Sequence, residues 1–512
     1  MTADQGALQP SPDLSADESL AKNRLGVAGI VFFVVAAAAP LVGMTGAVPV
    51  AIVLGNGAAV PGTYLVAGLV LLAFSVGYSA MSHRVSNTGA FFAYVGRGLG
   101  IVPGVGSAFV SLLAYIAVQL AIFGFFGAVA AAQFDSELGI DLSWWVWTLI
   151  AWAVVLVLSV LQVDIGAKLL GVLMLIEIGS LTLLAVVVLL QGGGPDGLGF
   201  VDSFSPSKIF AGGFGGSAGI ALAFAFASYI GFEATAIYAE ETKDPKRNVP
   251  IATYSAVSLI AILFAITSWA VVSGVGTNDV VNQVATISSV DGTPLANPAA
   301  VLYSVADEYV GHWLSELMSW LVLSSLFAGL LAFQNSAARY FFSMGRAGVL
   351  PRALDRVNGR GAPVIGSVAT SVITLAVIVL FVVTDKDPVL NLFNWFSGLA
   401  VLAIVLVEVL VSIAVIAYFR QTDVDRRPWN TLIAPIIAIV GLVGAAYLIM
   451  ARFGLLAGTA AEGVDPTTQS FGLSTTGWTL VLAPFTIFII GMVIGAIRRN
   501  DENEGAVADF VS

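Results

Sequence analysis

Long apolar stretches separated by short polar segments run through almost the whole chain. A helix that crosses a bilayer needs about 20 consecutive apolar residues. Twelve stretches reach roughly that length: residues 25–54, 61–82, 101–133, 143–161, 168–191, 212–241, 249–275, 313–345, 363–384, 389–419, 429–451 and 475–497. The pattern predicts an all-α membrane protein with twelve transmembrane helices, and a short amphipathic segment at 88–100 on the cytoplasmic side.

The composition supports a membrane protein and excludes several kinds of chemistry. Hydrophobic residues make up 58% of the chain and charged residues only 10%, whereas a soluble protein carries about 25% charged residues. The chain has no cysteine and only two histidines, so neither disulfides nor a His-rich or Cys-based metal centre is expected. We predict no metal and no cofactor. The net charge of −11, without a basic stripe, argues against nucleic acid, so the bilayer is the expected large-scale partner.

The basic residues predict the orientation. With the N-terminus inside, 18 of the 21 lysines and arginines lie in cytoplasmic segments, and the outer side keeps only Lys208, Lys386 and Arg452. The positive-inside rule therefore favours a plasma membrane protein with both termini in the cytoplasm. The polar residues 1–24 and the acidic residues 500–512 are predicted to be cytoplasmic tails, the first of them disordered.

Two predicted spans are interrupted by small, helix-weakening residues. The first span is broken within Ala-Pro40-Leu-Val-Gly43-Met-Thr45-Gly46, and the sixth within Ser228-Tyr-Ile-Gly231-Phe-Glu233. Unpaired backbone at membrane depth is tolerated only where it is buried in protein or lines a cavity. Matched interruptions of this kind point to the substrate site of a secondary transporter.

The positions of the two interruptions also predict an internal repeat. Spans 1–5 and 6–10 each begin with an interrupted helix, and an odd number of spans in each half turns the second half upside down. We therefore expect a transporter core at 25–420, built from inverted repeats at about 25–191 and 212–420. Spans 11 and 12, within 421–499, are additional.

The interruptions predict a site for a zwitterion. Free N–H groups after the first break suit a carboxylate, and free carbonyls at the second break suit an ammonium group. The candidate substrate-binding residues are Gly43, Met44, Thr45, Gly46, Phe226, Ala227, Ser228, Tyr229 and Gly231. The alternative for the first break is a kink that neighbouring helices relieve, and for the aromatic residues it is ordinary packing.

Three carboxylates lie within predicted spans, where an ionisable residue is costly and suggests a function. Glu233 begins the second half of span 6 and is a candidate for gating or substrate contact, or simply a helix-terminus partner. Glu177 lies in the middle of span 5 and is a candidate for ion coupling, or else for a buried structural hydrogen bond. Glu408 has no helix break beside it, which favours a structural role.

A cation site is a further possibility. Val42 at the first break and the hydroxyls of Ser324 and Ser325 in span 8 are its candidate ligands, because hard cations prefer oxygen. A serine in a membrane helix commonly bonds its own backbone, which is the alternative reading.

Three stretches of the chain resemble motifs of the amino acid–polyamine–organocation (APC) permeases. They are Phe226-Ala-Ser-Tyr-Ile-Gly-Phe-Glu233 with its continuation to Pro250, Asn335-Ser-Ala-Ala-Arg339 with Met344-Gly-Arg-Ala-Gly-Val-Leu-Pro351, and Tyr78-Ser-Ala-Met81 with Gly89-Ala-Phe-Phe-Ala-Tyr94. The resemblance covers about residues 25–420. It implies a LeuT-like fold with 5+5 inverted repeats, alternating access, and substrates among amino acids, amines and polyamines.

The chain also departs from that family in informative places. Many members read Gly-Ser-Gly-Ile in the first break, where this chain has Gly43-Met-Thr-Gly46-Ala. Some proton-coupled members carry a lysine at the position that aligns with Glu177, and a glutamate there can protonate or help to bind sodium. An antiporter subgroup places a tryptophan where Ala227 aligns, so the substrate stacking of that subgroup does not carry over.

These observations predict a secondary active transporter of amino acids or related amines that works by alternating access. No nucleotide-binding loop in its proper context is present, so uphill transport must use an ion or exchange gradient. Proton-coupled symport is favoured over sodium coupling, and an amine exchanger is the main alternative. A channel would be expected to show charged rings or a filter motif, and an enzyme a convergent catalytic cluster. Neither pattern is seen.

Overall fold

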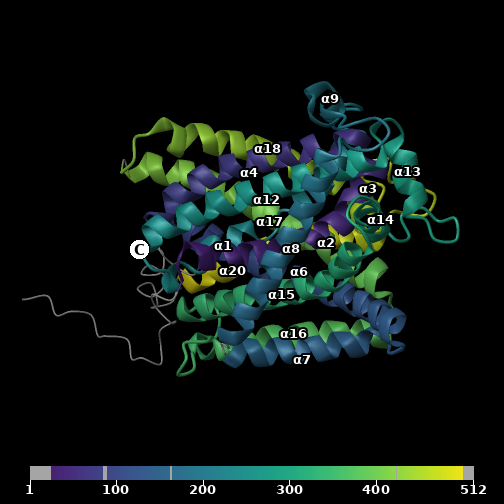
Figure 1. Cartoon of the computed structure of the whole chain (residues 1–512). Coiled ribbons are helices and arrows are strands. Elements are labelled where there is room, and N and C mark those ends of the chain that lie inside the picture. Colours follow the sequence, from purple (N-terminus) through teal and green to yellow (C-terminus); the bar gives the residue numbers. More distant parts are fainter. Residues whose placement is uncertain (1–24, 85–88, 162–163, 423, 500–512) are drawn as a thin grey trace, which may run out of the picture.

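The computed structural model describes residues 25–84, 89–161, 164–422 and 424–499 (Figure 1). The predicted tails, residues 1–24 and 500–512, lie outside these ranges. Within the described ranges the chain is helical, with a few isolated β-bridges, and twelve helical segments are long and apolar enough to cross a membrane. The prediction of an all-α fold with twelve spans is confirmed.

The spanning segments follow the predicted order. They are α1 (Val27–Ala38) with α2 (Pro40–Thr45) and α3 (Ala47–Leu54), α4 (Val60–Ser82), α6 (Ile101–Leu138), α7 (Trp144–Leu161), α8 (Asp164–Leu190), α11 (Ser217–Ala227) with the 3₁₀ turns η3 (Phe232–Ala236) and η4 (Ala239–Glu241), α12 (Pro245–Val275), α15 (His312–Arg346), α16 (Val364–Val383), α17 (Asn394–Thr422), α18 (Ala434–Ala451) and α20 (Thr475–Arg499). Shorter helices lie in the connections or at span ends: η2 (Gly57–Ala59), α5 (Phe91–Leu99), α9 (Phe200–Phe204), α10 (Pro206–Ile209), η5 (Thr277–Asp279), α13 (Val280–Ile287), α14 (Ala299–Tyr309), η6 (Arg352–Asp355), the π-helical turns η7 (Pro388–Phe393) and η8 (Trp429–Ile433), and α19 (Phe453–Leu456).

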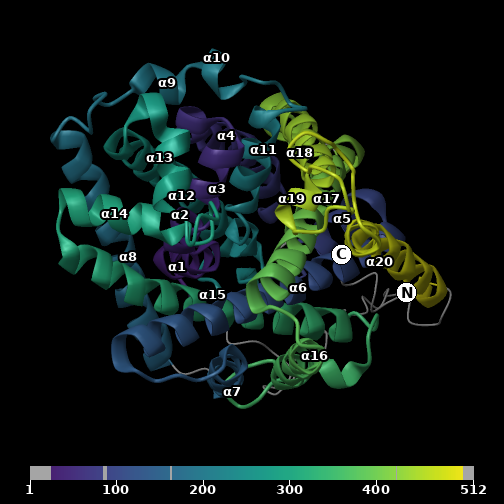
Figure 2. The same ribbon diagram turned by 90° about the vertical axis from the view of Figure 1, so that its right-hand side faces the viewer.

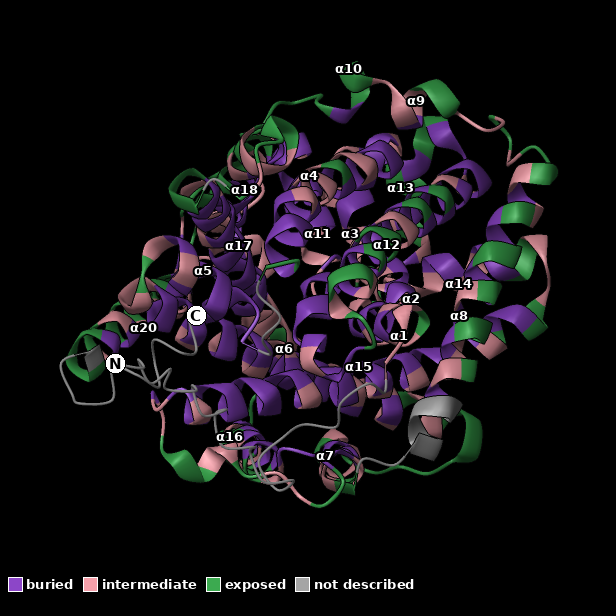
Figure 3. Ribbon diagram, turned by 90° about the vertical axis from the view of Figure 1, so that its left-hand side faces the viewer, coloured by how far each residue is buried: buried purple, intermediate pink, exposed green. Residues whose placement is uncertain are grey.

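The interrupted spans lie at the centre of the bundle. Figure 2 looks along the helices and shows α1, α2 and α3 surrounded by other helices, with α7 and α16 at the edge. The burial pattern in Figure 3 agrees, since a larger share of residues is buried in the central spans, 56% in Val27–Thr45 and 83% in Ser217–Ala236, than in α7 and α20, where it is 22%. The exposed side chains of the outer helices include Val157, Val372 and Ile489, as expected for surfaces that face lipid.

The first span is interrupted at both ends of the predicted stretch, at Ala39 and at Gly46. Ala39 adopts a left-handed conformation, with φ 43° and ψ 67°, and ends α1. The cause is Pro40, which disfavours helical geometry in the residue before it and has no N–H to donate to Ala36. Residues 40–45 then form a helical turn, and the chain kinks again at Gly46. The interruptions therefore lie within the predicted stretch, but the residues between them form a helical turn and do not leave an extended unpaired backbone. The second kink follows from Pro49, which cannot donate to the carbonyl of Thr45.

The sixth span is interrupted where the sequence places the break. α11 ends at Ala227, residues 228–231 form a turn, and Gly231 has φ 111°, a backbone conformation that favours glycine. Beyond it the chain continues as 3₁₀ turns rather than as the expected α-helix. Glu233 lies in the first of these turns, as predicted.

The connections form two groups, one at each end of the bundle. At one end, Leu25 pairs with Thr242, Arg84 donates to the carbonyl of Val424, and Arg360 to that of Leu161. At the other end, Asn56 donates to the carbonyl of Ile209, and Arg452 binds the carbonyl of Gly215 and two further carbonyls. Loops predicted to be cytoplasmic thus contact one another, and loops predicted to be external do the same.

One loop at the basic end is held by an ion pair. Arg427 donates to Asp425 at 2.6 Å, and these hydrogen bonds lower the pKa of Asp425 to about 2. The pair therefore stays ionised through the physiological pH range.

The short helix α5 corrects the expectation for 88–100. A helix is present, but Phe91, Phe92 and Tyr94 are almost completely buried and do not face a membrane surface. α5 packs against α6 and α17, and a Cβ on Gly98 would lie 2.2 Å from the carbonyl oxygen of Ala414. Because Gly98 has no side chain, α5 can pack directly against the backbone of α17 inside the bundle.

Candidate substrate and coupling site

The two interrupted spans meet in the middle of the protein. A Cβ on Gly231 would lie 2.6 Å from the Cβ of Ala37 and 3.2 Å from the nitrogen of Ala38. The bare backbone of the second break therefore packs directly against the end of α1. The two spans also lie side by side at Phe33 and Tyr238, whose rings stack with their centres 4.9 Å apart. The predicted adjacency of the two breaks is observed, and we call this contact the seam.

Glu177 joins the start of α2 to two scaffold helices. Its Oε1 accepts a hydrogen bond from the N–H of Leu41 at 2.9 Å and another from the hydroxyl of Ser325 at 3.0 Å. The side chain comes from α8 and is 2% exposed. Because Pro40 has no N–H, Leu41 offers the first free donor of α2, and a carboxylate at that position is favourable. Leu41 was not among the predicted site residues, although its place directly after Pro40 was a usable signal.

The candidate cation ligands do not form an open cage. Ser325 faces Glu177, but the hydroxyl of Ser324 donates to the carbonyl of Leu321 in its own helix at 2.9 Å. The carbonyl of Val42 accepts from the N–H of Gly46 at 2.9 Å and from the hydroxyl of Thr45 at 3.2 Å. The space beside Glu177 is lined by Ala36, Leu170, Leu173, Met174, Ser324, Ser325 and Ala328, and it is too narrow for a water molecule.

The geometric premise for a carboxylate cradle at Gly43–Gly46 is wrong, because this stretch is helical. The N–H of Gly43 donates to the carbonyl of Ala39 at 3.2 Å, and that of Gly46 to Val42. The hydroxyl of Thr45 donates to Leu41 at 2.9 Å, and Met44 is buried. Gly43 instead permits close packing, since a Cβ there would lie 2.6 Å from the ring of Phe264. That these four residues bind substrate stays a prediction.

The second break has free backbone carbonyls, as the predicted site for an ammonium group requires. Among the described residues, no hydrogen bond is donated to the carbonyl oxygen of Ala227 or of Ser228. The hydroxyl of Ser228 bonds the carbonyl of Phe224 at 3.0 Å and the hydroxyl of Tyr64 at 3.0 Å. Tyr229 is buried and donates to the carbonyl of Tyr64 at 2.7 Å. Phe226 is largely buried as well, so the aromatic residues of this break fix the turn by packing.

Glu233 folds back onto the break. Its Oε2 accepts a hydrogen bond from the N–H of Gly231 at 2.9 Å, whereas its Oε1 is buried and has no hydrogen-bond partner. Tyr78 donates to the backbone carbonyl of Glu233 at 2.7 Å and so holds η3 against α4.

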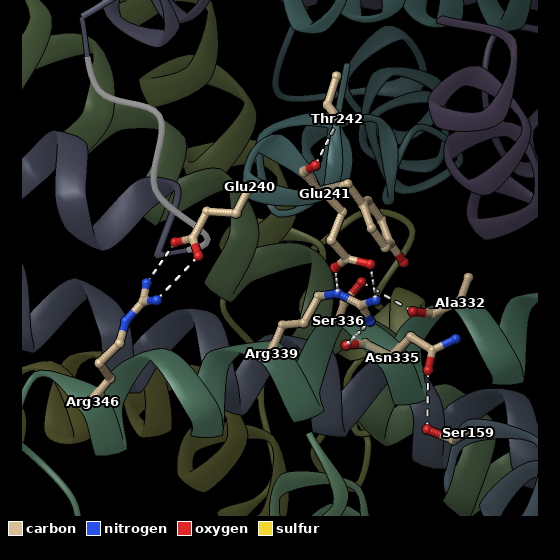
Figure 4. A network of polar contacts seen from close by, with 10 residues as sticks. Ser159, Glu240, Glu241, Thr242, Ala332, Asn335, Ser336, Arg339 and Arg346 are labelled. Atoms are coloured by element: carbon tan, nitrogen blue, oxygen red, sulfur yellow. Dashed lines mark hydrogen bonds and ion pairs between the residues drawn. The ribbon is translucent and has the colours of Figure 1, made fainter. Parts of the chain in front are cut away.

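Ion pairs hold the C-terminal end of span 6 to α15 (Figure 4). Arg339 binds Glu241 through two hydrogen bonds, of 2.6 and 2.9 Å, and both side chains are buried. Arg346 binds Glu240 at 2.5 and 3.1 Å. The guanidinium of Arg339 also lies 4.7 Å from the centre of the Tyr238 ring. The sequence motifs contain these residues but do not indicate the pairs, because 98 positions separate Glu241 from Arg339.

An open pocket of about 450 Å³ lies apart from the seam, at the end of the bundle that holds the loops predicted to be external. Its polar lining includes Asn56, Asp202, Lys208, Asp279 and Asn282. It begins at Gly55, just beyond α3, a helix about 12 Å long that separates it from the kink at Gly46.

Comparisons with known proteins indicate the family to which the chain belongs. The family described as "Amino acid permease" matches residues 29–504 of the chain. A putrescine transporter, PotE, from Haemophilus influenzae is 25% identical over 288 residues, which cover 56% of this chain and 58% of the relative. A branched-chain amino acid permease, BcaP, from Lactococcus lactis is 25% identical over 238 residues and 46% of each chain. The histidine permease of Saccharomyces cerevisiae is 26% identical over 320 residues, 60% of this chain and 51% of the relative.

These matches span about half the length of the curated relatives. The relatives are transporters, and the substrates in their names differ from one another. The matches therefore establish a class of protein and not a substrate. The family match, in contrast, covers nearly the whole chain and includes both interrupted spans. The chain therefore belongs to the amino acid permease family, within the APC superfamily of transporters.

Proposed function

We propose that the protein imports amino acids or related amines across the plasma membrane by alternating access, driven by protons. The observation that carries this proposal is the seam, where two interrupted helices meet in the buried interior with Gly231 against Ala37 and Ala38. Interrupted helices at the middle of a bundle are where transporters of this architecture bind their substrates.

An amine group fits the second break. The carbonyl oxygens of Ala227 and Ser228 accept no hydrogen bond from the described residues, and an ammonium group supplies three donors. Putrescine, histidine and branched-chain amino acids, which name the three relatives, all carry an amine. We place the remainder of the substrate between this break and residues 43–46 of span 1.

Glu177 is the proposed coupling residue. As a carboxylate it accepts hydrogen bonds from both Leu41 and Ser325, and so ties span 1 to α15 as well as to its own helix α8. A proton on this carboxyl makes it a poorer acceptor and loosens the start of α2 from the scaffold. Proton binding at Glu177 therefore shifts the balance between conformations that differ in the position of span 1.

The geometry favours a proton over sodium. A sodium ion needs several oxygen ligands, but the carbonyl of Val42 and the hydroxyl of Ser324 already take part in hydrogen bonds within their own helices. The space beside Glu177 does not admit a water molecule, whereas a proton needs no such space.

Uptake into proteoliposomes tests the coupling. Glu177→Gln is expected to abolish accumulation against a gradient while substrate binding stays measurable, because the amide oxygen can still accept hydrogen bonds from Leu41 and Ser325 but cannot take up a proton. The matched control is Glu316→Gln, an exposed glutamate of α15. Unchanged proton-driven accumulation in Glu177→Gln would refute the coupling role.

The same vesicles separate the alternatives. Uptake that needs a sodium gradient identifies a sodium symporter, and uptake that needs counter-substrate inside identifies an exchanger. A panel of labelled amino acids, diamines and polyamines, compared with a substrate that lacks the amine, then tests the role assigned to Ala227 and Ser228. Equal uptake of the compound without an amine would contradict that assignment.

A further inference from the structure

One narrow strip of α4 stays exposed, although most of this helix is buried. Leu69 is 65% exposed and Leu72, Ala73 and Val76 are partly exposed. These positions are three or four residues apart, so they lie on one face of the helix. Seven residues beyond Val76 the same face reaches His83, which is exposed and follows the last residue of α4. We call the four apolar residues the α4 strip.

Two helices flank the α4 strip. α4 packs between α18 and α12 (Figure 1). A Cβ on Gly77 would lie 2.9 Å from the ring of Pro435 in α18, and a Cβ on Gly68 would lie 2.7 Å from the Cβ of Ala261 in α12. At 3.6 residues per turn these two glycines lie on opposite sides of the strip. The strip is therefore an apolar surface bounded on both sides by a helix.

The distance along α4 matches one leaflet of a bilayer. From Leu72 to His83 the helix rises about 16 Å, which is about half of the roughly 30 Å hydrocarbon core. Aromatic side chains lie near the same end, as is typical of the membrane interface. Trp429 in η8 is 53% exposed, and Tyr254, near the start of α12, is 36% exposed. The strip thus ends at His83, at the level of lipid headgroups.

Two guanidinium groups lie at this end of α4. Arg84 is exposed and donates to the carbonyl of Val424 at 3.2 Å, a bond that holds the end of α4 against the loop before η8. Arg427 belongs to the same loop. Its side chain is 70% exposed, whereas that of its partner Asp425 is 11% exposed. The two guanidinium groups are therefore more accessible than the carboxylate.

A third cation comes from α12. Lys246 lies in the first turn of that helix and is exposed. The charges act together at His83, whose pKa is lowered by partial burial and then by Arg427 and Arg84. Asp425 opposes them with a smaller effect, and Lys246 adds to them. The surface at the end of the strip is thus positive despite the carboxylate.

A cationic end on an apolar strip fits a ligand that carries both an anion and a hydrocarbon chain. Guanidinium groups bind phosphate through strong, charge-assisted hydrogen bonds. Basic sites between helices on the cytoplasmic side of a membrane bind anionic headgroups. A free anion gains nothing from the apolar strip, and an uncharged headgroup gains little from three cations.

We propose that the α4 strip binds one anionic phospholipid of the cytoplasmic leaflet, with its phosphate held by Arg84, Arg427 and Lys246. An acyl chain lies along Leu72 and Val76, between α12 and α18. The three cations come from three separate elements, so the bound headgroup joins the end of α4, the loop before η8 and the start of α12. An anionic lipid thereby stabilises the packing of these elements, a role that is separate from substrate binding at the seam.

Lipid titration of the purified, delipidated full-length protein tests the site. Phosphatidylglycerol is expected to raise Tm in detergent more than phosphatidylcholine does, because it alone carries a net negative charge. Arg84→Gln and Arg427→Gln are each expected to weaken the apparent affinity for phosphatidylglycerol about fivefold, the effect of one basic residue at an anionic surface. Arg360→Gln is the matched control, since Arg360 is also exposed at the basic end and its side chain donates to a carbonyl, that of Leu161.

Three results of this titration would overturn the proposal. The first is equal stabilisation by the two lipids. The second is an equal loss of affinity in Arg360→Gln, which would show a general effect of charge. The third is stabilisation by inorganic phosphate alone that equals that by phosphatidylglycerol, which would indicate a site for free anions.

Fluorescence quenching in the wild type avoids any dependence on the folding of the arginine variants. Nanodiscs of one composition carry bromine either on phosphatidylglycerol or on phosphatidylcholine. The quenching of Trp429, obtained as the difference from Trp429→Phe, is expected to be greater when phosphatidylglycerol carries the bromine. Equal quenching by the two lipids would contradict the proposal. Neither readout involves transport, so each outcome is independent of the result for Glu177→Gln.

Discussion

Single residues decide where the two central helices are interrupted. Pro40 ends α1 by removing a donor and by forcing Ala39 out of helical geometry, and Gly231 supplies the positive φ that turns span 6. Gly231 also packs directly against Ala37 and Ala38, which immediately precede the break at Ala39. Backbone freedom and close approach therefore coincide at the seam.

Gly231→Ala is expected to destabilise the protein by about 2–4 kcal/mol, and to lower uptake. An alanine carries strain at φ 111°, and its Cβ would collide with that of Ala37. Gly213→Ala is the matched control, because Gly213 has φ 70° but open space around it. Thermal unfolding in detergent and proteoliposome uptake measure both effects. An equal loss in the two variants would show that the collision with α1 has no importance.

At the scale of elements, side-chain pairs hold the interrupted spans to continuous helices. Span 1 is tied to α8 through Glu177, and span 6 to α15 through Glu241 and Arg339. The second pair is buried and has two hydrogen bonds, so loss of one partner leaves an unpaired charge. Such contacts fix the conformation seen here. The proposed alternating access therefore requires them to change if span 6 moves.

Glu241→Gln is expected to cost about 3–5 kcal/mol of stability, because Arg339 then stays buried without its carboxylate. Replacing both residues with methionine should recover much of the loss. Asp202→Asn, which breaks the exposed pair with Lys208, is the control and should cost at most about 1 kcal/mol. Thermal unfolding of the purified variants measures all three. A double variant less stable than Glu241→Gln would show that the pair has a role beyond neutralising Arg339.

The molecule as a whole has an apolar outer surface and two ends that differ in their content of basic residues. Exposed apolar side chains lie on the outer helices. The loops that carry most of the basic residues contact one another at one end of the bundle. The positive-inside rule assigns that end to the cytoplasm. The chain has no cysteine, so a single introduced cysteine reports on one position alone.

Cysteine labelling is expected to confirm this orientation. Gln283→Cys on α13 should react with a membrane-impermeant maleimide in intact cells. Lys246→Cys at the start of α12 should react only after permeabilisation, because it lies on the basic end. The reversed pattern would place both termini outside.

The sequence by itself determined the class of protein, the number and order of the spans, and the break in span 6. These properties depend on apolar length and on glycine, which act locally along the chain. The effect of proline on the preceding residue also indicates the break at Ala39. The glycines at 43 and 46, in contrast, suggested unpaired backbone where the chain forms a helical turn. Their actual use is packing against Phe264 and a kink before Pro49.

Only the tertiary structure decided which groups meet. The 136 positions between Leu41 and Glu177 carry no local signal that the N–H of one will find the carboxyl of the other. The same holds for Glu241 and Arg339, which 98 positions separate. The physical reason is that each contact depends on how several helices pack, and packing joins faces whose partners no local pattern specifies.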